Sequence, residues 1–413
     1  MLTIEFLEQI ILDQKAAFED KGTDVERDID FKKYLSVPQI VVVSGVRRCG
    51  KSTLLKQFSR RAAPYYYLNF EDDRLLSFTA SDFQNLLLAF KKQRAAKFVY
   101  LDEVQNVIGW ESFARRLFEA GHKVFITGSS AKLLSGELAS RLTGRYLKIE
   151  LFPFSFKEFL RWQSVSTTDK SSTGEARLLK QFDEYARLGG FPEMLKLRLP
   201  EIAVRIYEDV VYRDLIVRYK IRETRAFRQL AGWLFANIAK ETNYNALAKA
   251  LQVKSVASIK NHVAFMAESY LLFEMVKYDW SLKRQYISGR KFYAIDAGLR
   301  GEVAFVVSED RGRILENIVY LELRRRGKAP YYAKDKAECD FVTVEKNKIT
   351  AAIQVADLFD DGNRERELAG LIEALSLGKL KQGLILTRSQ SDNLIIKGFK
   401  IKVTPLWQWL IEE

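Results

Sequence analysis

The stretch IVVVSGVRRCGKST, residues 40–53, decides the fold of the amino-terminal half of this chain. The β-branched run at its start predicts a buried parallel strand. The G-x-x-x-x-G-K-S pattern that follows predicts a phosphate-binding loop leading into a helix. Gly45 and Gly50 let the backbone turn its N–H groups toward phosphate oxygens, and the helix beginning near Lys51 directs its positive N-terminus to the same place. The stretch therefore predicts a nucleotide site, with ATP as the expected ligand.

Side-chain chemistry suggests roles for the residues of this loop. We expect Lys51 to reach the β- and γ-phosphates as a point charge and Ser52 to supply a hydroxyl ligand to Mg²⁺. For Cys49 the alternatives are an oxidation switch, because a helix N-terminus lowers a thiol pKa, and a tolerated small residue. The other positions expected to surround the phosphates are Gly45, Val46, Arg47, Arg48, Gly50 and Thr53.

A second motif, KFVYLDEVQ at residues 97–105, favours the same site. Its apolar residues predict a buried strand that ends at Asp102 and Glu103, and ligands of open α/β sheets bind at this end of the strands. Asp102 suits a water-mediated contact to Mg²⁺, and Glu103 suits the general base that orients the attacking water. The alternative is a pair of surface carboxylates after a strand, and the loop upstream favours the catalytic interpretation.

Further strands and helices alternate around these motifs, which favours an α/β fold with a parallel sheet covered by helices. The expected strands cover residues 39–43, 65–70, 123–127 and 146–151, beside the one that ends at Asp102. The expected helices cover residues 52–61, 82–93, 110–120 and 131–142.

Two kinds of polar residue at the edges of this sheet are further candidates for catalysis. Ser129 or Ser130 would hydrogen-bond the γ-phosphate or the lytic water as a sensor, with a helix N-cap as the alternative. Arg141 and Arg145 are candidate arginine fingers for the nucleotide of a neighbouring protomer. The alternative for these arginines is a favourable interaction with a helix dipole.

Five stretches together carry a resemblance to a known group of proteins: VVVSGVRRCGKSTLL, YLNFEDDRLL, VYLDEVQ, ITGSSAKLLSGELASRLTGRY and LFPFSFKEFL. The chain resembles the AAA-type P-loop ATPases of bacteria and archaea that carry a C-terminal domain of unknown function. The resemblance implies an ATPase sheet of the additional-strand type, in which the sensor strand flanks the strand of the P-loop.

Charge and composition limit the kinds of partner. The chain has 66 basic and 53 acidic residues, and the net charge of +13 favours either plain solubility or affinity for anionic surfaces such as nucleic acid. Two cysteines and two histidines far apart make a disulfide framework and a zinc site implausible. No apolar run approaches the roughly 18 residues of a membrane span, and we see no signal peptide. We therefore expect a cytoplasmic protein without a membrane partner.

The middle of the chain predicts a linker, a helical lid and a winged helix. Residues 163–174 are polar and predict a flexible loop. The GGFPE corner at 189–193 suits either a lid over the nucleotide or a tight turn between helices. Three helices and two strand-like runs then predict a helix-turn-helix with a wing; they cover residues 226–242, 244–251, 255–269, 272–278 and 291–295.

The predicted winged helix carries cations that we expect to be exposed. Such a surface suits double-stranded DNA, with the third helix in the major groove and the wing on the backbone. Packing or protein interaction is the alternative, because the third helix offers few residues of the types that read bases. Lys260 and Asn261 are the best candidates on that helix. The expected exposed cations are Lys254, Lys260, Lys283, Arg284, Arg290 and Lys291.

The last third of the chain resembles the core of PD-(D/E)XK nucleases in its expected order of helix, three strands, helix and strand. Glu316 takes the place of the helix acid and Asp340 that of the central aspartate. Gln354 replaces the second acid and Ala356 the lysine, so the negative charge of the second acid and the cation beside the attacking water are missing. Glu316, Glu338 and Asp340 stay candidates to bind a cation. We expect an inactive nuclease-like scaffold, and an ATP-dependent nuclease is the alternative.

These observations combine into one expectation for the whole chain. It is an ATP-hydrolysing AAA-type protein that uses ATP and Mg²⁺, couples nucleotide state to movement of the later domains, and acts on DNA, with a homo-oligomer as a further possibility. A nucleotide-gated regulatory or protein-interaction switch is the alternative. The expected domains are an N-terminal helical segment at 1–34, the ATPase at 35–160, the loop and lid at 161–225, the winged helix at 226–300 and the nuclease-like domain at 301–413.

Overall fold

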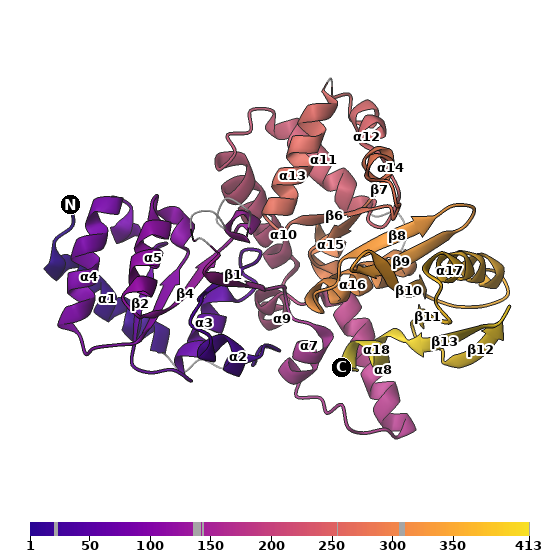
Figure 1. Ribbon diagram of the computed structural model, residues 1–413, viewed down its shortest axis with the longest axis horizontal. Coiled ribbons are helices and arrows are strands. Elements are labelled where there is room, and N and C mark those ends of the chain that lie inside the picture. The colour runs from indigo at the N-terminus through magenta and orange to yellow at the C-terminus, as the bar shows by residue number, and fades with distance from the viewer. Residues whose placement is uncertain (20–23, 135–141, 143, 254, 305–309, 413) are drawn as a thin grey trace. The chain divides into compact units, whose positions relative to one another are not determined.

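A computed structural model describes residues 1–19, 24–134, 142, 144–253, 255–304 and 310–412 (Figure 1). The chain forms two compact units. The first comprises Met1–Phe152 together with the short segment Glu268–Tyr270, and the second comprises Pro153–Ala267 and Leu271–Glu413. Of the helices in the described ranges, none combines the length and the apolar character that a bilayer crossing requires.

A five-stranded parallel sheet forms the centre of the first unit. Its order is β2-β3-β4-β1-β5, so β4, the strand that precedes the candidate sensor serines, lies between the strand of the P-loop, β1, and the strand of the two carboxylates, β3. This confirms the expected parallel α/β sheet. The strands are β1 (Ile40–Ser44), β2 (Tyr65–Asn69), β3 (Phe98–Asp102), β4 (Lys123–Gly128) and β5 (Tyr146–Glu150).

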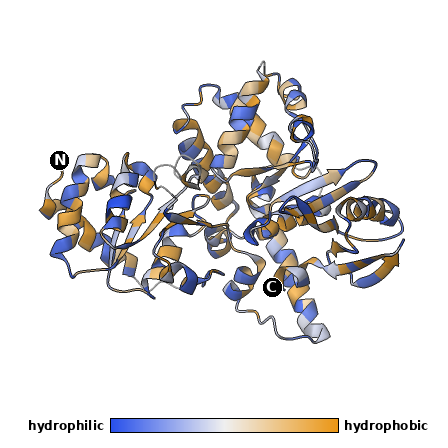
Figure 2. Cartoon of the chain, in the orientation of Figure 1, coloured by the Kyte–Doolittle hydropathy of each residue, from blue (hydrophilic) through white to orange (hydrophobic). Residues whose placement is uncertain are grey.

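The first unit also contains α-helices whose apolar sides are buried. Helix α5 buries Trp110, Phe113, Ala114 and Leu117, which follow the i, i+3, i+4, i+7 spacing of one helix face, and its ribbon carries both hydrophilic and hydrophobic residues (Figure 2). The helices are α1 (Ile4–Glu19), α2 (Phe31–Ser36), α3 (Lys51–Ser59), α4 (Phe83–Lys92) and α5 (Trp110–Glu119). Short 3₁₀ turns are η1 (Asp73–Leu75), η2 (Ala80–Asp82), η3 (Val104–Asn106) and η4 (Ala131–Leu134). Of the helix expected over 131–142, residues 135–141 lie outside the described residues.

The second unit begins with a run of helices and a two-stranded antiparallel sheet of β6 (Leu272–Val276) and β7 (Arg290–Ala294). The helices are α7 (Phe156–Trp162), α8 (Ser172–Leu188), α9 (Pro192–Leu197), α10 (Pro200–Asp209), the π-helical η5 (Val210–Val217), α11 (Thr224–Ala236), α12 (Tyr244–Ala250), α13 (Val256–Glu268), α14 (Leu282–Ile287) and α15 (Ala297–Val303). Helices α11, α12 and α13 lie where the sequence predicts the three helices of a helix-turn-helix.

The predicted wing between β6 and β7 is wrong in its conformation, because the connection contains helix α14. The side chain of Ser281 caps this helix by accepting a hydrogen bond from the Arg284 backbone N–H. Two expected exposed cations are also buried. Arg290 is 6% exposed and its guanidinium pairs with Glu274 across the two strands, while Lys291 is 1% exposed and pairs with carboxylates. Lys260, Lys283 and Arg284 are exposed as expected, and Lys254 lies outside the described residues.

A six-stranded mixed sheet with three helices forms the rest of the second unit. The order is β12-β13-β11-β10-β9-β8. Helix, three strands, helix and strand follow one another as the sequence predicts, and β12, β13 and α18 were not expected; the nuclease resemblance itself stays a prediction. The elements are α16 (Arg311–Arg325), β8 (Pro330–Lys334), β9 (Glu338–Glu345), β10 (Lys348–Ala356), α17 (Arg364–Gly378), β11 (Gln382–Thr387), β12 (Asp392–Ile396), β13 (Phe399–Pro405) and α18 (Leu406–Ile411).

Candidate functional site

The loop between β1 and α3 has the backbone shape of a phosphate cradle, and its two glycines are required by that shape. Gly50 has φ +100° and precedes the first residue of α3, a conformation that strongly favours glycine. A Cβ atom at Gly45 would lie 2.1 Å from the backbone oxygen of Leu151. The loop therefore closes against the end of β5 only because position 45 has no side chain.

Lys51 lies inside this loop. Its Nζ atom is 3.3 Å from the carbonyl oxygen of Gly45, 3.2 Å from that of Val46 and 3.4 Å from Glu103 Oε1. The residue is 4% exposed. The ammonium thus occupies the centre of the loop and faces both the loop carbonyls and the carboxylate at the end of β3.

Asp102 ends β3 in a fully buried position with several hydroxyl partners. Thr127 on β4 donates from its hydroxyl to Asp102 Oδ1, and Tyr67 on β2 donates to Oδ2 over 3.2 Å. Burial and the neighbouring Glu103 carboxylate raise the pKa of Asp102, while hydrogen bonds from Ser52 and Thr127 act against them. Asp102 is therefore linked directly to Ser52, the other residue expected to bind the metal.

Glu103 stands at the turn after β3 with an unusual backbone. Its φ is +52°, and its backbone N–H donates to the Thr127 hydroxyl oxygen over 3.0 Å. Burial raises the pKa of its carboxyl, but the Lys51 ammonium and a hydrogen bond from Gln105 outweigh that effect and leave the pKa lowered. The carboxylate is therefore ionised at neutral pH, as a general base must be. A left-handed backbone at a bulky residue is uncommon and occurs preferentially at functional positions.

A cavity of about 440 Å³ opens beside Ser52, which is an exposed residue. Its aromatic wall is the pair Phe18 and Tyr67, whose rings stack with centroids 3.9 Å apart. The other residues along the cavity are Gln14, Ala17, Thr53, Lys56, Asn69, Glu71 and Asp72. Ser52, whose hydroxyl is expected to bind a metal, thus borders this cavity.

The serines after β4 are buried and connected to the P-loop strand. Ser129 is 1% and Ser130 is 4% exposed. Ser44, the last residue of β1, donates from its hydroxyl to the carbonyl oxygen of Ser130 over 2.8 Å and accepts from the Tyr270 hydroxyl over 3.0 Å. Tyr270 belongs to the first unit although it follows α13 in the sequence.

Arg27 stabilises the loop through hydrogen bonds to backbone carbonyl oxygens. Its guanidinium donates to the carbonyl oxygen of Cys49 over 2.9 Å and to that of Phe152 over 2.5 Å, and the residue is 5% exposed. The Cys49 thiol is fully buried, which raises its pKa. A raised pKa and burial oppose an oxidation switch and favour the alternative of a tolerated small residue.

The other arginines that the sequence analysis assigned to the site lie at different places in the structure. Arg47 pairs with Glu71 over 2.7 Å at the rim of the loop, and Arg48 has φ +65° within it. Arg145 pairs with Glu119 over 2.8 Å at the surface. Arg141 lies outside the described residues.

Three residues of this site escaped the sequence analysis, namely Arg27, Tyr67 and Thr127. Arg27 stands in a charged segment without a motif, and nothing in the sequence marks it. Thr127 has a signal in the sequence, because it is the last polar side chain of β4, the strand that precedes the candidate sensor serines. Tyr67 is one of three consecutive tyrosines at the start of β2, which predict a strand but not a hydrogen bond to Asp102.

Comparison with known proteins agrees with this geometry. Residues 37–160 match the AAA domain family, and residues 179–310 match a domain of unknown function. An uncharacterized protein of Methanocaldococcus jannaschii is 35% identical over 424 residues, which cover 97% of this chain and 94% of the archaeal protein. The chain belongs to the same family as this archaeal protein. The AAA domain of the present chain, residues 37–160, contains the P-loop, Asp102 and Glu103, and this match confirms the expected AAA-type P-loop domain.

Other similar proteins have lower sequence identity to this chain. An uncharacterized protein of Haemophilus influenzae is 29% identical over 405 residues, covering 94% of this chain and 96% of that protein. Among solved structures, the replication initiator DnaA bound to AMPPCP and single-stranded DNA is 15% identical, with 58% of this chain and 86% of that chain covered and a TM-score of 0.26. The Hsp104–ADP complex of S. cerevisiae is 14% identical, with 64% and 41% covered and a TM-score of 0.33.

Proposed function

We propose that this protein binds ATP with Mg²⁺ and hydrolyses it. The observation that carries the proposal is the position of Lys51, whose buried ammonium lies between the P-loop carbonyls and the Glu103 carboxylate, 3.4 Å from its Oε1 atom. An ammonium in a glycine turn at a helix N-terminus fits the phosphates of a nucleoside triphosphate. The match of residues 37–160 to the AAA domain family supports this assignment.

The donor set also fits the cofactors. Backbone N–H groups from Gly45 to Thr53 and the Lys51 ammonium would hold the phosphates, and Ser52 with Asp102 would hold Mg²⁺, which neutralises phosphate charge when it is bound. Glu103 would accept the proton of the attacking water, because its carboxyl is ionised and held in place by Gln105. Ser129 and Arg145 stay candidates for the sensor and for a finger toward a second copy.

Two substitutions test hydrolysis separately from binding. We expect Glu103→Gln to keep nucleotide affinity while turnover falls about 100-fold or more, because the variant lacks the base. Lys51→Ala should lose affinity as well, because it removes the charge that faces the phosphates. Phosphate release and binding of a fluorescent nucleotide measure the two quantities, and Glu5→Gln, an exposed carboxylate of the same unit, is the matched control. Full turnover in Glu103→Gln would refute the proposed base.

We further propose that nucleotide state reaches the later part of the chain through Tyr270. This residue donates to Ser44 at the base of the P-loop, and Ser44 in turn donates to Ser130. Helix α13 ends at Glu268, two residues before Tyr270. A shift of the P-loop strand would therefore pull on a segment that is covalently continuous with α13.

DNA is the candidate partner of α13, and exposed Lys260 and Asn261 on this helix favour it. The burial of Arg290 and Lys291 weakens that proposal, because it removes two of the expected phosphate contacts. ATP turnover measured with and without double-stranded DNA, over a range of salt concentrations, separates the alternatives. Stimulation that fades with salt supports DNA, whereas slow turnover that ignores DNA supports a nucleotide-gated switch with a protein partner.

A further inference from the structure

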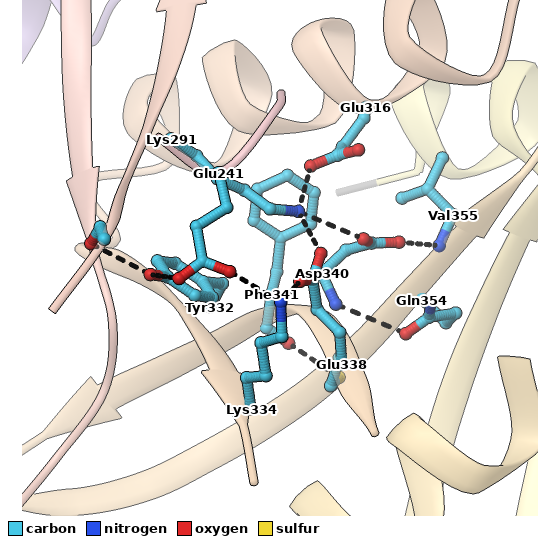
Figure 3. Close-up of polar contacts among 12 residues, drawn as sticks. Glu241, Lys291, Glu316, Tyr332, Lys334, Glu338, Asp340, Phe341, Gln354 and Val355 are labelled. Atoms are coloured by element: carbon cyan, nitrogen blue, oxygen red, sulfur yellow. Dashed lines mark hydrogen bonds and ion pairs between the residues drawn. The ribbon is translucent and has the colours of Figure 1, made fainter. Parts of the chain in front are cut away.

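A cluster of charged side chains surrounds the ammonium group of Lys291 inside the second unit (Figure 3). The Nζ atom lies 2.8 Å from Glu338 Oε1, 2.9 Å from Glu316 Oε1 and 3.5 Å from Asp340 Oδ1. The Lys291 side chain is 2% exposed. An ammonium has three N–H donors and no acceptor, so the three carboxylates account for all of its donors.

Each carboxylate has a second donor that fixes its orientation. These donors are the Tyr293 hydroxyl for Glu316 at 2.7 Å, the Val355 backbone N–H for Asp340 at 2.9 Å, and the Lys334 ammonium for Glu338 at 3.1 Å. Buried charges are tolerated when they are paired and their remaining lone pairs are satisfied. The cluster is therefore built around one cation, with its acceptors held in place from outside.

The cation and the acids come from different elements. Lys291 is on β7, Glu316 is on α16, and Glu338 and Asp340 are on β9 (Figure 3). Glu316 and Asp340 are the two acids that the sequence assigned to metal positions.

The residue in the place of the missing acid, Gln354, has hydrogen-bond partners other than this cation. Gln354 accepts a hydrogen bond from the Asp340 backbone N–H over 3.2 Å and donates to Glu367. One lone pair of its carbonyl oxygen is therefore engaged by the backbone of β9. Within the described ranges, no group of three or more acidic, histidine or cysteine side chains is arranged to hold a metal ion.

We propose that the Lys291 ammonium takes the place of the divalent cation in a three-carboxylate site, so that this domain carries its cation as part of the chain and does not cut nucleic acid. The proposal is independent of ATP hydrolysis. A nuclease needs a metal that polarises the phosphate and binds the attacking water, and an alkylammonium whose donors are all engaged does neither. A metal ion entering beside the ammonium would meet a buried like charge a few ångströms away, so the site is closed to metals in the native chain.

The test converts the closed site into an open one. Lys291→Ala removes the charge and leaves space among three carboxylates, so Mn²⁺ should bind the full-length variant at least about tenfold more tightly than the native protein. Calorimetry with Mn²⁺ in the absence of nucleotide measures this binding. Lys291→Ala combined with Asp340→Asn should lose the gain, which separates this site from Mn²⁺ bound at the P-loop. Lys336→Ala, which removes an exposed lysine near β9, is the control and should resemble the native protein.

A second measurement protects the test against loss of folding in Lys291→Ala. Native protein and Asp340→Asn are compared for Mn²⁺ binding and for cleavage of linear and supercoiled DNA. Equal Mn²⁺ binding and no cleavage by either protein support the proposal. Mn²⁺ binding or cleavage that disappears in Asp340→Asn would overturn it, as would a folded Lys291→Ala variant that gains no Mn²⁺ affinity.

Discussion

Thr127 connects the Asp102 carboxylate to the backbone N–H of Glu103 in the proposed ATPase site through a single hydroxyl group. It donates to Asp102 Oδ1 and accepts from the Glu103 backbone N–H. The proposed metal ligand and the proposed base are therefore positioned by the same side chain. Because a hydroxyl group can donate and accept at once, threonine or serine is the residue type that this geometry requires.

Replacing Thr127 by Val should damage turnover more than nucleotide affinity. The variant has the same shape but leaves the buried Glu103 N–H without its acceptor and Asp102 without one of its donors, so we expect a loss of about 2 kcal/mol in the free energy of unfolding. Thr127→Ser keeps the hydroxyl and should restore turnover. Urea denaturation and phosphate release check both effects, and a Val variant with native turnover would contradict the positioning role.

Single residues also show where sequence reasoning reaches its limit. The P-loop, Asp102 and Glu103 were found because each follows a strand in a pattern set by neighbouring residues. Lys291 was misplaced because its neighbours in the sequence resemble a charged surface, whereas its partners Glu316 and Asp340 stand 25 and 49 residues away. Burial of a lysine by distant carboxylates leaves no local signal.

At the scale of elements, the GGFPE corner and helix α15 form one interlocked structure. Asp296 caps α15 by accepting from the Leu299 N–H over 2.9 Å, and its other oxygen accepts from the Gly190 N–H over 2.7 Å. Burial raises the pKa of Asp296 to about 6, although these hydrogen bonds lower it. The sequence predicted the corner as either a lid or a tight turn, and its hydrogen bond to a helix cap 106 residues away could not be read from it.

Two glycine substitutions in these elements should have opposite effects on stability. Gly189 has φ +73° and a Cβ there would lie 1.9 Å from Asp296 Oδ1, so Gly189→Ala should lower the free energy of unfolding by about 3 kcal/mol or more. Gly301 lies within α15 with nothing near its Cβ position, so Gly301→Ala should raise it by roughly 0.5–1 kcal/mol. Urea denaturation of both variants tests this, and a neutral Gly189→Ala would contradict the interlock.

At the scale of the whole molecule, the predicted transmission of nucleotide state depends on one hydroxyl group. Tyr270→Phe keeps the buried ring but removes the donor to Ser44. We expect ATP to bind this variant with nearly native affinity, while the ATP-dependent change in hydrogen exchange of α13 becomes smaller. Tyr286→Phe, an exposed tyrosine of α14, is the control. An unchanged exchange response in Tyr270→Phe would remove this residue from the proposed coupling.

The contact between Tyr270 and Ser44 has a consequence for biosynthesis. The two residues are 226 positions apart in the chain, and long-range contacts of this kind form late in folding. On the ribosome, the strands of the amino-terminal sheet are synthesised well before Tyr270. The Ser44 hydroxyl at the end of β1 can therefore accept the hydrogen bond from Tyr270 only later. A nascent chain that has grown only through β5 should therefore bind nucleotide with nearly native affinity, as we expect for Tyr270→Phe, whereas the coupling of nucleotide state to α13 can form only after Tyr270 has been synthesised.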